Sequence, residues 1–305
     1  MLVEGDWPLT SPRFTLADAF LSSVVLTWGV HFVVAKRVMT VLDPLAFALV
    51  RFALASVLLL IVAARGGRPR FSPRDWIQVG WLGLLIGANQ VLWLRGLELT
   101  GAGNAALIMA ASPAFVAIMR WAGGERPVAL AAGGFAVAMA GVGLIATPHG
   151  PGRLQPMGGV LMLGAAITWA LYTASGPGLL NRHPALPVTA GAFAVATAVL
   201  IVPGLAPAVA APWGQLTPML WLELGYSAFL AGSVAWVLWY RAVSQIGPAR
   251  VMVYQYFIPV VAALAAAAWL GESFGPREVL GATLVIGGTL AVRLSLPVAR
   301  ALASE

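Results

Sequence analysis

The sequence contains no cysteine and few charged residues. Without cysteine there can be no disulfide framework, no thiolate metal site and no cysteine nucleophile. Charged residues make up 10% of the chain, whereas a soluble protein of this length carries about 25%. So few charges cannot cover a surface that faces water. An ordinary soluble domain is therefore excluded, and most of the outer surface must face lipid.

Hydrophobic residues make up 60% of the chain, and the mean hydropathy is +0.88. They fall into runs of about 20 residues, which is long enough for a helix to cross a hydrocarbon core of about 30 Å. Clusters of Pro, Gly and Arg separate the runs. The sequence therefore predicts an all-α integral membrane protein with ten transmembrane helices. The expected spans are residues 16–35, 44–64, 76–97, 103–121, 128–146, 157–179, 187–206, 216–240, 249–270 and 277–295.

The basic residues are distributed unequally between the two sets of loops. Twelve arginines lie in the N-terminus, the C-terminus and every second loop, against five Lys or Arg residues in the other loops. Cytoplasmic loops carry the excess of positive charge in membrane proteins. We therefore expect both termini in the cytoplasm. Basic residues confined to short loops also argue against nucleic acid as a partner.

The chain repeats itself. WLRGLELTGAGNAALIMAASPAF (93–115) aligns without a gap with WYRAVSQIGPARVMVYQYFIPVV (239–261), and TWGVHF (27–32) aligns with TWALYT (168–173). Further on, Gly134 and Gly141 match Gly281 and Gly288. We predict two five-helix repeats, residues 1–150 and 151–305. Because five is odd, the second repeat enters the bilayer inverted, which predicts a pseudo-two-fold axis in the membrane plane and a central cavity between the halves.

Ten spans in two halves, Trp-Gly in the first span, and the repeated Arg/Gly/Pro pattern resemble the EamA-type branch of the drug/metabolite transporter superfamily. The aromatic-rich lining is similar to that of a bacterial aromatic amino-acid exporter in this superfamily. The resemblance implies a transporter in the bacterial inner membrane, with a pathway between spans 1, 3, 4, 6, 8 and 9 and with spans 5 and 10 behind it. The matching positions are Trp28, Gly29, Pro113, Trp169 and Pro259.

Two prolines interrupt apolar runs at matched repeat positions, Pro113 in MAASPAFVAIM and Pro259 in YQYFIPVVAAL. Proline within a helix removes one backbone hydrogen bond, and here it frees the carbonyl of Met109 or of Gln255. A free carbonyl is costly in hydrocarbon and should face protein or a wet cavity. We expect both prolines to act as hinges that line the pathway.

Polar and aromatic residues at membrane depth usually face the interior of a helix bundle. Several of them share helical faces one turn apart, which predicts a cavity with stacking rings and a few hydrogen-bonding groups. Such a cavity suits an amino acid or an amphipathic aromatic metabolite. The candidate substrate-binding residues are Trp28, His31, Asn89, Trp93, Met109, Ser112, Trp169, Tyr172, Trp236, Tyr240, Tyr254, Gln255 and Tyr256.

Acidic residues are scarce, and only Glu223 is expected inside the hydrocarbon. Small multidrug pumps of the same superfamily exchange protons through a carboxylate in their first span, but this chain reads FLSSVVLTWGVHF there. We therefore expect uniport or facilitated exchange rather than proton coupling. His31 titrates near neutral pH in its unperturbed form, but beside a tryptophan it is expected to be a hydrogen-bonded lining residue. Arg51, within the second span, is expected to snorkel or to pair with a neighbour.

The expected function is export of amino acids by alternating access, by a protein that acts as a monomer. Alternatives within transport are a broad drug exporter and a nucleotide-sugar or phosphometabolite carrier, which would need several basic residues in the cavity. An intramembrane enzyme is disfavoured, because HExxH, GxSxG, a phosphate-binding glycine loop and paired intramembrane aspartates are all absent from the sequence. No catalytic residue, metal or cofactor is expected.

Overall fold

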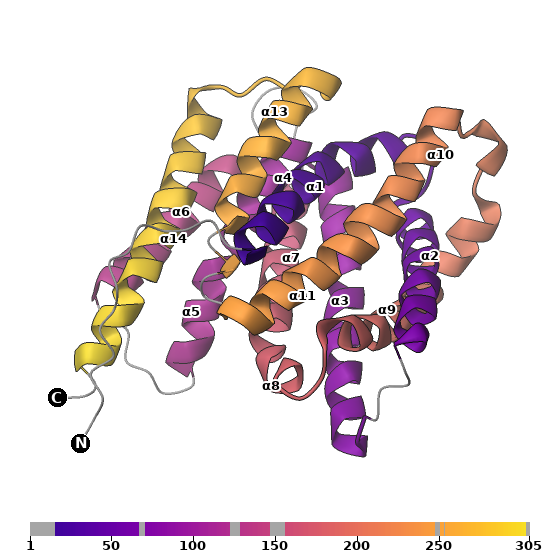
Figure 1. Cartoon of the computed structure of the whole chain (residues 1–305). Coiled ribbons are helices and arrows are strands. Elements are labelled where there is room, and N and C mark those ends of the chain that lie inside the picture. The colour runs from indigo at the N-terminus through magenta and orange to yellow at the C-terminus, as the bar shows by residue number, and fades with distance from the viewer. Residues whose placement is uncertain are drawn as a thin grey trace.

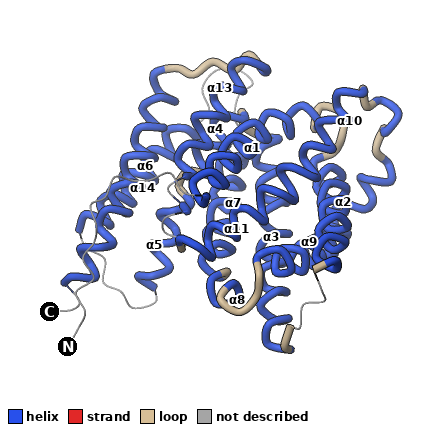
Figure 2. The backbone as a smooth tube through the Cα atoms, viewed as in Figure 1, coloured by secondary structure: helices blue, strands red, loops and turns tan. Residues whose placement is uncertain are grey.

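The structure is a computed structural model that describes residues 16–66, 71–122, 129–146, 156–247, 251–252 and 254–302. Within these ranges the chain is helical and contains no strand (Figures 1 and 2). The α-helices are α1 (Leu16–Val38), α2 (Pro44–Arg65), α3 (Pro73–Glu98), α4 (Ala102–Met109), α5 (Ser112–Ala122), α6 (Ala129–Ala146), α7 (Pro156–Ser175), α8 (Pro177–Leu180), α9 (Ala185–Ala210), α10 (Pro218–Gly225), α11 (Ala235–Ile246), α13 (Ile258–Leu270) and α14 (Pro276–Leu302). Three further elements are the 3₁₀ turns η1 (Trp213–Gln215) and η3 (Gln255–Phe257) and the π-helix η2 (Tyr226–Val234).

Six helical stretches are long and apolar enough to cross a membrane. They are Leu16–Val38, Pro44–Arg65, Pro73–Glu98, Pro156–Leu180, Ala185–Ala210 and Pro218–Ile246. They coincide with the expected spans 1, 2, 3, 6, 7 and 8. Expected spans 4, 5 and 9 contain shorter apolar helices, and α14 covers the tenth. The all-helical prediction is confirmed for the described residues. Six of the ten expected spans are both long and apolar enough to cross a membrane, so the count of ten is not confirmed.

Prolines and short polar caps explain where the long helices begin. Helices α2, α3 and α10 all start at a proline, whose missing N–H costs nothing at the first helical position. The residue before each proline is a cap: Asp43 accepts from the Leu45 amide at 2.7 Å, and Thr217 accepts from the Leu220 amide at 3.3 Å. Ser72 forms a reciprocal capping box with Asp75. These local signals place the helix starts within a few residues of the expected spans.

Both candidate hinge prolines stand at the start of a helix, not in the middle of one. The fourth span is divided by a turn at Ala110 and Ala111, and Pro113 is the second residue of α5. The ninth span passes through η3, and Pro259 is the second residue of α13. A proline at such a position does not clash with the preceding turn. The sequence pattern therefore marks two discontinuous spans at equivalent positions of the two repeats.

Contacts between the repeats link positions that correspond in sequence. The rings of Phe52 on α2 and Phe193 on α9, 141 positions apart, stack with centroids 4.6 Å apart. One turn further on, the Ser56 hydroxyl lies 2.8 Å from that of Thr197, again 141 positions away. Trp28 and Trp169 have the same separation in sequence and lie 5.3 Å apart. A residue meets its own equivalent only near a two-fold axis, so these pairs indicate pseudo-two-fold symmetry between the repeats.

Helices α6 and α14 pack together through glycines at the edge of the molecule opposite α2 and α9 (Figure 1). A Cβ added at Gly134 would lie 2.6 Å from the carbonyl oxygen of Gly288, and one at Gly141 would lie 2.7 Å from that of Gly281. The two helices therefore run antiparallel. Gly134 corresponds to Gly281 and Gly141 to Gly288, so exchange of the repeats converts one contact into the other. Other helix contacts between the repeats are also paired by the symmetry. Helix α1 of the first repeat packs on α13 and α11 of the second, and its equivalent α7 packs on α4 and α3 of the first.

Substitution of Gly134 by valine should force α6 and α14 apart, because the added carbons would overlap the backbone of α14. We expect a loss of about 1–3 kcal/mol of stability, as for other overpacked sites, measured as a lower thermal unfolding midpoint of the detergent-purified protein. Gly133→Val is the matched control, because a Cβ at this exposed neighbour meets nothing within 4 Å. Equal midpoints for the two variants would contradict the glycine-mediated contact.

Candidate functional site: a cavity between the repeats

A cavity of about 80 Å³ lies between helices of the two repeats. This volume is several times what one water molecule requires. Helices α1, α2, α3 and α4 contribute lining residues from the first repeat, and α7, η2, α11, η3 and α13 contribute them from the second. The lining residues that the structure describes are Trp28, His31, Phe32, Arg51, Asn89, Gln90, Trp93, Ala106, Met109, Ala110, Trp169, Ala231, Trp236, Gln255 and Ile258.

Three tryptophans form one wall of the cavity. Trp28 meets Trp169 and Trp236 edge to face, with centroids 5.3 and 5.8 Å apart, and Trp169 meets Trp236 at 5.1 Å. Edge-to-face packing suits the charge distribution of aromatic rings. Trp239 supports the group through contacts of 5.3 Å with Trp28 and 5.2 Å with Trp169. The matched TW motifs thus place their tryptophans in contact at the centre of the molecule.

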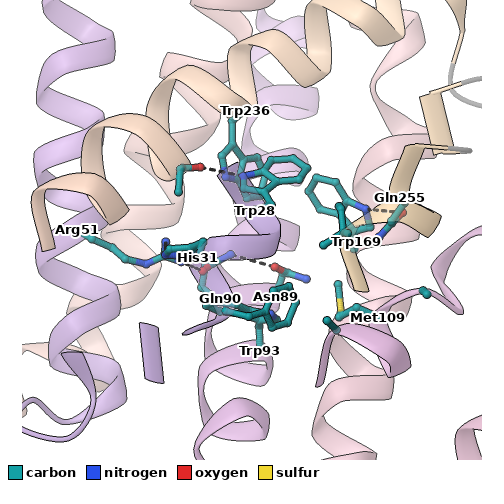
Figure 3. A pocket seen from close by; sticks show the side chains of 15 residues that line it. Trp28, His31, Arg51, Asn89, Gln90, Trp93, Met109, Trp169, Trp236 and Gln255 are labelled. Carbon is teal, nitrogen blue, oxygen red and sulfur yellow. Dashed lines mark hydrogen bonds between the residues drawn. The ribbon is translucent and has the colours of Figure 1, made fainter. Parts of the chain in front are cut away.

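Two of these indoles have their N–H groups satisfied by residues of the π-helix η2 and the 3₁₀ turn η3. Trp28 Nε1 donates to the carbonyl of Ala231 in the π-helix η2 at 3.0 Å. Trp169 Nε1 donates to Gln255 Oε1 in η3 at 3.3 Å (Figure 3). Both rings are thereby fixed in orientation, because a buried indole N–H requires an acceptor. The ring orientations depend on the backbone of η2 and on the Gln255 side chain of η3.

The π-helix η2 was not predicted from the sequence, and Gly232 makes it sterically feasible. A Cβ at Gly232 would lie 2.7 Å from the carbonyl oxygen of Ser227, five residues earlier. Ser233 stabilises the same turn by donating to the Ala228 carbonyl, also five residues back, at 2.9 Å. π-Helical turns occur frequently at functional sites. Here the turn presents the Ala231 carbonyl to Trp28 and the Ser227 hydroxyl to His31.

A second wall is polar and is built around Arg51 from α2. Its Nη1 lies 3.3 Å from His31 Nε2, and its Nη2 donates to Gln90 Oε1. Gln90 Nε2 donates to Asn89 Oδ1 at 3.0 Å (Figure 3). Asn89 Nδ2 donates in turn to the Ala165 carbonyl at 2.8 Å. The chain of bonds runs from α2 through α3 to α7. It connects side chains of the first repeat to the backbone of α7 in the second.

The hydrogen bonds of His31 fix its protonation state in this arrangement. A guanidinium can only donate, so His31 Nε2 must accept from Arg51. The Ser227 hydroxyl, 3.1 Å away, then donates to the same nitrogen. His31 is therefore neutral with its proton on Nδ1, and its ring stacks on Trp93 at 5.3 Å. It is a hydrogen-bonded lining residue here.

The break in the fourth span and the break in the ninth lie next to each other. Ser112 donates to the Met109 carbonyl at 2.5 Å, which satisfies the carbonyl that Pro113 leaves without its usual partner. The Ile258 amide donates to the Gln255 carbonyl, which Pro259 would otherwise free. Gln255 Nε2 then lies 3.5 Å from Ser112 Oγ. The two discontinuous spans thus share one polar contact beside the cavity.

The structure brings most of the predicted site residues to the cavity, but not all of them. Ser112 is buried behind Met109 and reaches the lining only through Gln255. Tyr172 and Tyr240 stack on each other at 4.5 Å, and Tyr172 packs against the outer sides of Trp169 and Trp236. They support the tryptophan wall from behind, which corrects their expected lining role. The predicted residues on the lining are Trp28, His31, Asn89, Trp93, Met109, Trp169, Trp236 and Gln255.

Tyr254 and Tyr256 also lie off the cavity lining. The Tyr254 hydroxyl donates to Asp18 in the first turn of α1, and Tyr256 is buried. The 3₁₀ turn at Gln255–Phe257 points consecutive side chains in different directions, so only Gln255 of this tyrosine-rich stretch reaches the lining. Their predicted substrate contact is therefore not supported in this arrangement.

Sequence reasoning missed several lining residues. Arg51 was expected to snorkel or to pair with a neighbour, yet its side chain is buried and lines the cavity. Gln90, directly after Asn89, was not among the predicted site residues, but its side chain accepts from Arg51 and lines the cavity. Phe32, Ala106, Ala110, Ala231 and Ile258 complete the lining and carry no sequence signal of their own.

Glu223, the expected intramembrane carboxylate, lies away from the cavity. Its Oε1 accepts from Arg37 Nε at 2.6 Å, near the end of α1. Of the lining residues that the structure describes, none is acidic. Glu223, the one acidic residue expected inside the hydrocarbon, is thus engaged in an ion pair with Arg37.

Membrane-length helices that surround a polar and aromatic cavity define a multi-pass membrane protein. The chain belongs to the EamA-like transporter family, whose family model matches residues 15–147 and again residues 156–294. The two matches cover both halves of the internal repeat. The resemblance drawn from the sequence is confirmed at the level of the family.

Relatives along almost the whole chain are named as transporters. An uncharacterized transporter of Archaeoglobus fulgidus is 32% identical over 88% of this chain and 94% of its own length. A probable terminal-alkyne amino-acid exporter of Streptantibioticus cattleyicolor is 29% identical over 88% of this chain and 90% of its own. The uncharacterized inner membrane transporter YedA of Escherichia coli K12 is 26% identical over 90% and 89%, respectively. A crystal structure 17% identical in sequence superposes with a TM-score of 0.63 over 94% of this chain and 98% of the other, so the two share a fold.

Gly232→Ala should destabilise the π-helix, because the added methyl overlaps the Ser227 carbonyl. In an ordinary α-helix the same change stabilises by about 1 kcal/mol, so the sign of the effect reports the π geometry. We expect a lower thermal unfolding midpoint for Gly232→Ala. Gly225→Ala, at the last residue of α10 directly before η2 and with open space around its Cβ, should leave the midpoint unchanged or raise it. A stabilised Gly232→Ala protein would show that the π turn is absent.

Proposed function

We propose that this protein exports amino acids, aromatic and other neutral ones, and related metabolites across the bacterial inner membrane. The observation that carries the proposal is the cavity, in which stacking rings and hydrogen-bonding side chains converge from both repeats. Concave sites with an apolar body and a few fixed polar groups are typical of small-molecule binding. Support also comes from the relative named as a probable amino-acid exporter.

The proposed mechanism is alternating access. Two repeats related by a pseudo-two-fold axis, residues 1–150 and 151–305, can exchange conformations and so expose a central site to one side and then to the other. Discontinuous helices beside the substrate site are common in such transporters. The breaks at Pro113 and Pro259 make the fourth and ninth spans discontinuous beside the cavity, and we assign these two prolines as hinges. In this proposal both termini lie in the cytoplasm, and one chain suffices for transport.

Transport is proposed to be facilitated rather than coupled to protons. Proton exchange needs a titratable group that both the proton and the substrate can reach. The described lining contains no carboxylate, and its single histidine, His31, is held between Arg51 and Ser227. A nucleotide-sugar or phosphometabolite carrier is less favoured, because Arg51 is the single cationic side chain on the described lining. A broad drug exporter stays an alternative, and the family assignment disfavours an intramembrane enzyme.

Purified protein in liposomes should take up labelled neutral amino acids down their concentration gradients. Uptake should be similar with and without a pH gradient, because no carboxylate is proposed to carry a proton. The measurement is initial uptake of labelled tryptophan, phenylalanine and leucine, with protein-free liposomes as the background. Strict dependence on the pH gradient would refute facilitated transport, and uptake at background level for every amino acid would refute the substrate class.

Trp28→Ala should reduce tryptophan uptake by about tenfold, since a ring stacked on the substrate is worth up to about 1.5 kcal/mol. The matched control is Trp269→Ala on α13, whose side chain is 55% exposed and lies off the cavity lining. Both variants should be compared at equal amounts of folded protein, judged by gel filtration. Equal uptake by the wild type and Trp28→Ala would remove Trp28 from the site.

A further inference from the structure

Arg51 is a buried cation without a buried anion. Its side chain lies in the middle of α2 and is 3% exposed. Of the ion pairs among the described residues, none involves Arg51. Its hydrogen-bond partners, His31 and Gln90, are both neutral. A buried arginine normally faces a carboxylate, because an uncompensated charge costs several kcal/mol.

The surroundings of Arg51 compensate this charge only in part. The guanidinium carbon lies 5.3 Å from the ring of Phe47, 5.0 Å from that of Phe52 and 5.6 Å from that of Trp93. Aromatic faces attract a cation, but they do not accept its N–H groups in the planar pattern that a carboxylate offers. The Nε atom of Arg51 has no hydrogen-bond partner among the described residues. This nitrogen is itself buried. Nη1 and Nη2 each carry two N–H groups and each has one side-chain partner, His31 or Gln90. The guanidinium therefore retains donor capacity at these two nitrogens, and the Arg51 side chain lines the cavity.

The position of Arg51 gives the cavity two different ends. Figure 3 shows the guanidinium beside His31 and Gln90 at one side, with Trp169 and Gln255 at the other. One end thus offers a positive charge and hydrogen-bond donors, and the other offers ring faces. A molecule with an acidic group at one end and an apolar or aromatic body at the other would match this arrangement.

We propose that Arg51 binds the carboxylate of the transported molecule and that a carboxylate is the group the cavity requires. This inference rests on the proposed transport function and adds the recognised group to it. One guanidinium neutralises one negative charge, which matches a carboxylate better than a phosphate dianion. Because no described lining residue is acidic, the ammonium group of an amino acid finds no counter-charge there. Recognition is therefore through the acid group, and the ammonium group is tolerated rather than required.

The experiment compares three probes that differ only in their charged groups: tryptophan, tryptophanamide and indole-3-propionate. Binding to the detergent-purified protein is measured by isothermal titration calorimetry. Tryptophanamide lacks the carboxylate and should bind at least tenfold more weakly than tryptophan. Indole-3-propionate lacks the ammonium and should bind at least as tightly as tryptophan. Inorganic phosphate should not compete with either acid, and competition by phosphate would overturn the assignment to a carboxylate.

Three variants separate a binding role from a structural one. Arg51→Gln should reduce the affinity for both acids at least tenfold and leave tryptophanamide unaffected, whereas Arg51→Lys, which keeps the charge, should retain part of the preference. Without ligand, Arg51→Gln should unfold at the same or a higher temperature than the wild type, because it removes an uncompensated buried charge. Arg241→Gln is the matched control: this arginine also lies over a ring, that of Phe20, but is exposed and off the lining. It should change none of these affinities.

The outcomes distinguish this inference from the proposed function. If Arg51→Gln transports and binds tryptophan as the wild type does, the inference fails while amino-acid transport stands. If indole-3-propionate binds in an Arg51-dependent manner but no amino acid binds, the inference stands and the amino-acid assignment fails. Equal wild-type affinities for tryptophan and tryptophanamide would overturn the inference, as would a folded wild type that binds none of the three probes. If Arg51→Gln fails to fold, the inference is still tested by two measurements: the affinities of the wild type for the three probes, and those of the Arg51→Lys variant.

Discussion

The structure depends on one constraint: within a bilayer, every polar group needs a partner inside the protein. The breaks in the fourth and ninth spans satisfy it locally. The Ser112 hydroxyl donates to the Met109 carbonyl, and the Ile258 amide donates to the Gln255 carbonyl. The indole N–H of Trp28 satisfies it across the two repeats, and that of Trp169 satisfies it within the second repeat. Arg51 departs from it most strongly, because this buried side chain carries a charge that no ion pair among the described residues balances.

The symmetry between the repeats turns these partners into a shared site. Phe52 meets Phe193, and Trp28 meets Trp169, so the equivalent helices of the two halves face each other across one cavity. Glycines let α6 and α14 run in close contact at the edge of the molecule. A cavity built from both halves changes whenever the halves move relative to each other. In the proposed mechanism this coupling links substrate binding to exposure on one side of the membrane.

The fold was largely predictable because long hydrophobic runs mark the helices and because matched motifs recur at a nearly constant separation along the chain. The paired TW motifs predicted Trp28 and Trp169 at the centre, and the paired prolines marked the discontinuous spans. The site was less predictable, because helical periodicity says nothing about side-chain rotation or π-turns. Tyr172 and Tyr240 therefore stack behind the wall, and the role of Gly232 emerges only from a contact five residues away. The position of Arg51 on the cavity lining was not predicted, because the sequence does not show which buried charges lack a partner.

The orientation of the two repeats tests the account most directly. Thr40, after α1, and Asn181, after α8, stand at equivalent positions 141 residues apart, and both are exposed. Because the chain has no cysteine, Thr40→Cys and Asn181→Cys each carry one thiol, which a membrane-impermeant maleimide can label in intact cells. The account predicts that Cys at 40 is labelled from outside and that Cys at 181 is labelled only after permeabilisation. Labelling of both from the same side would contradict inverted repeats and, with them, alternating access.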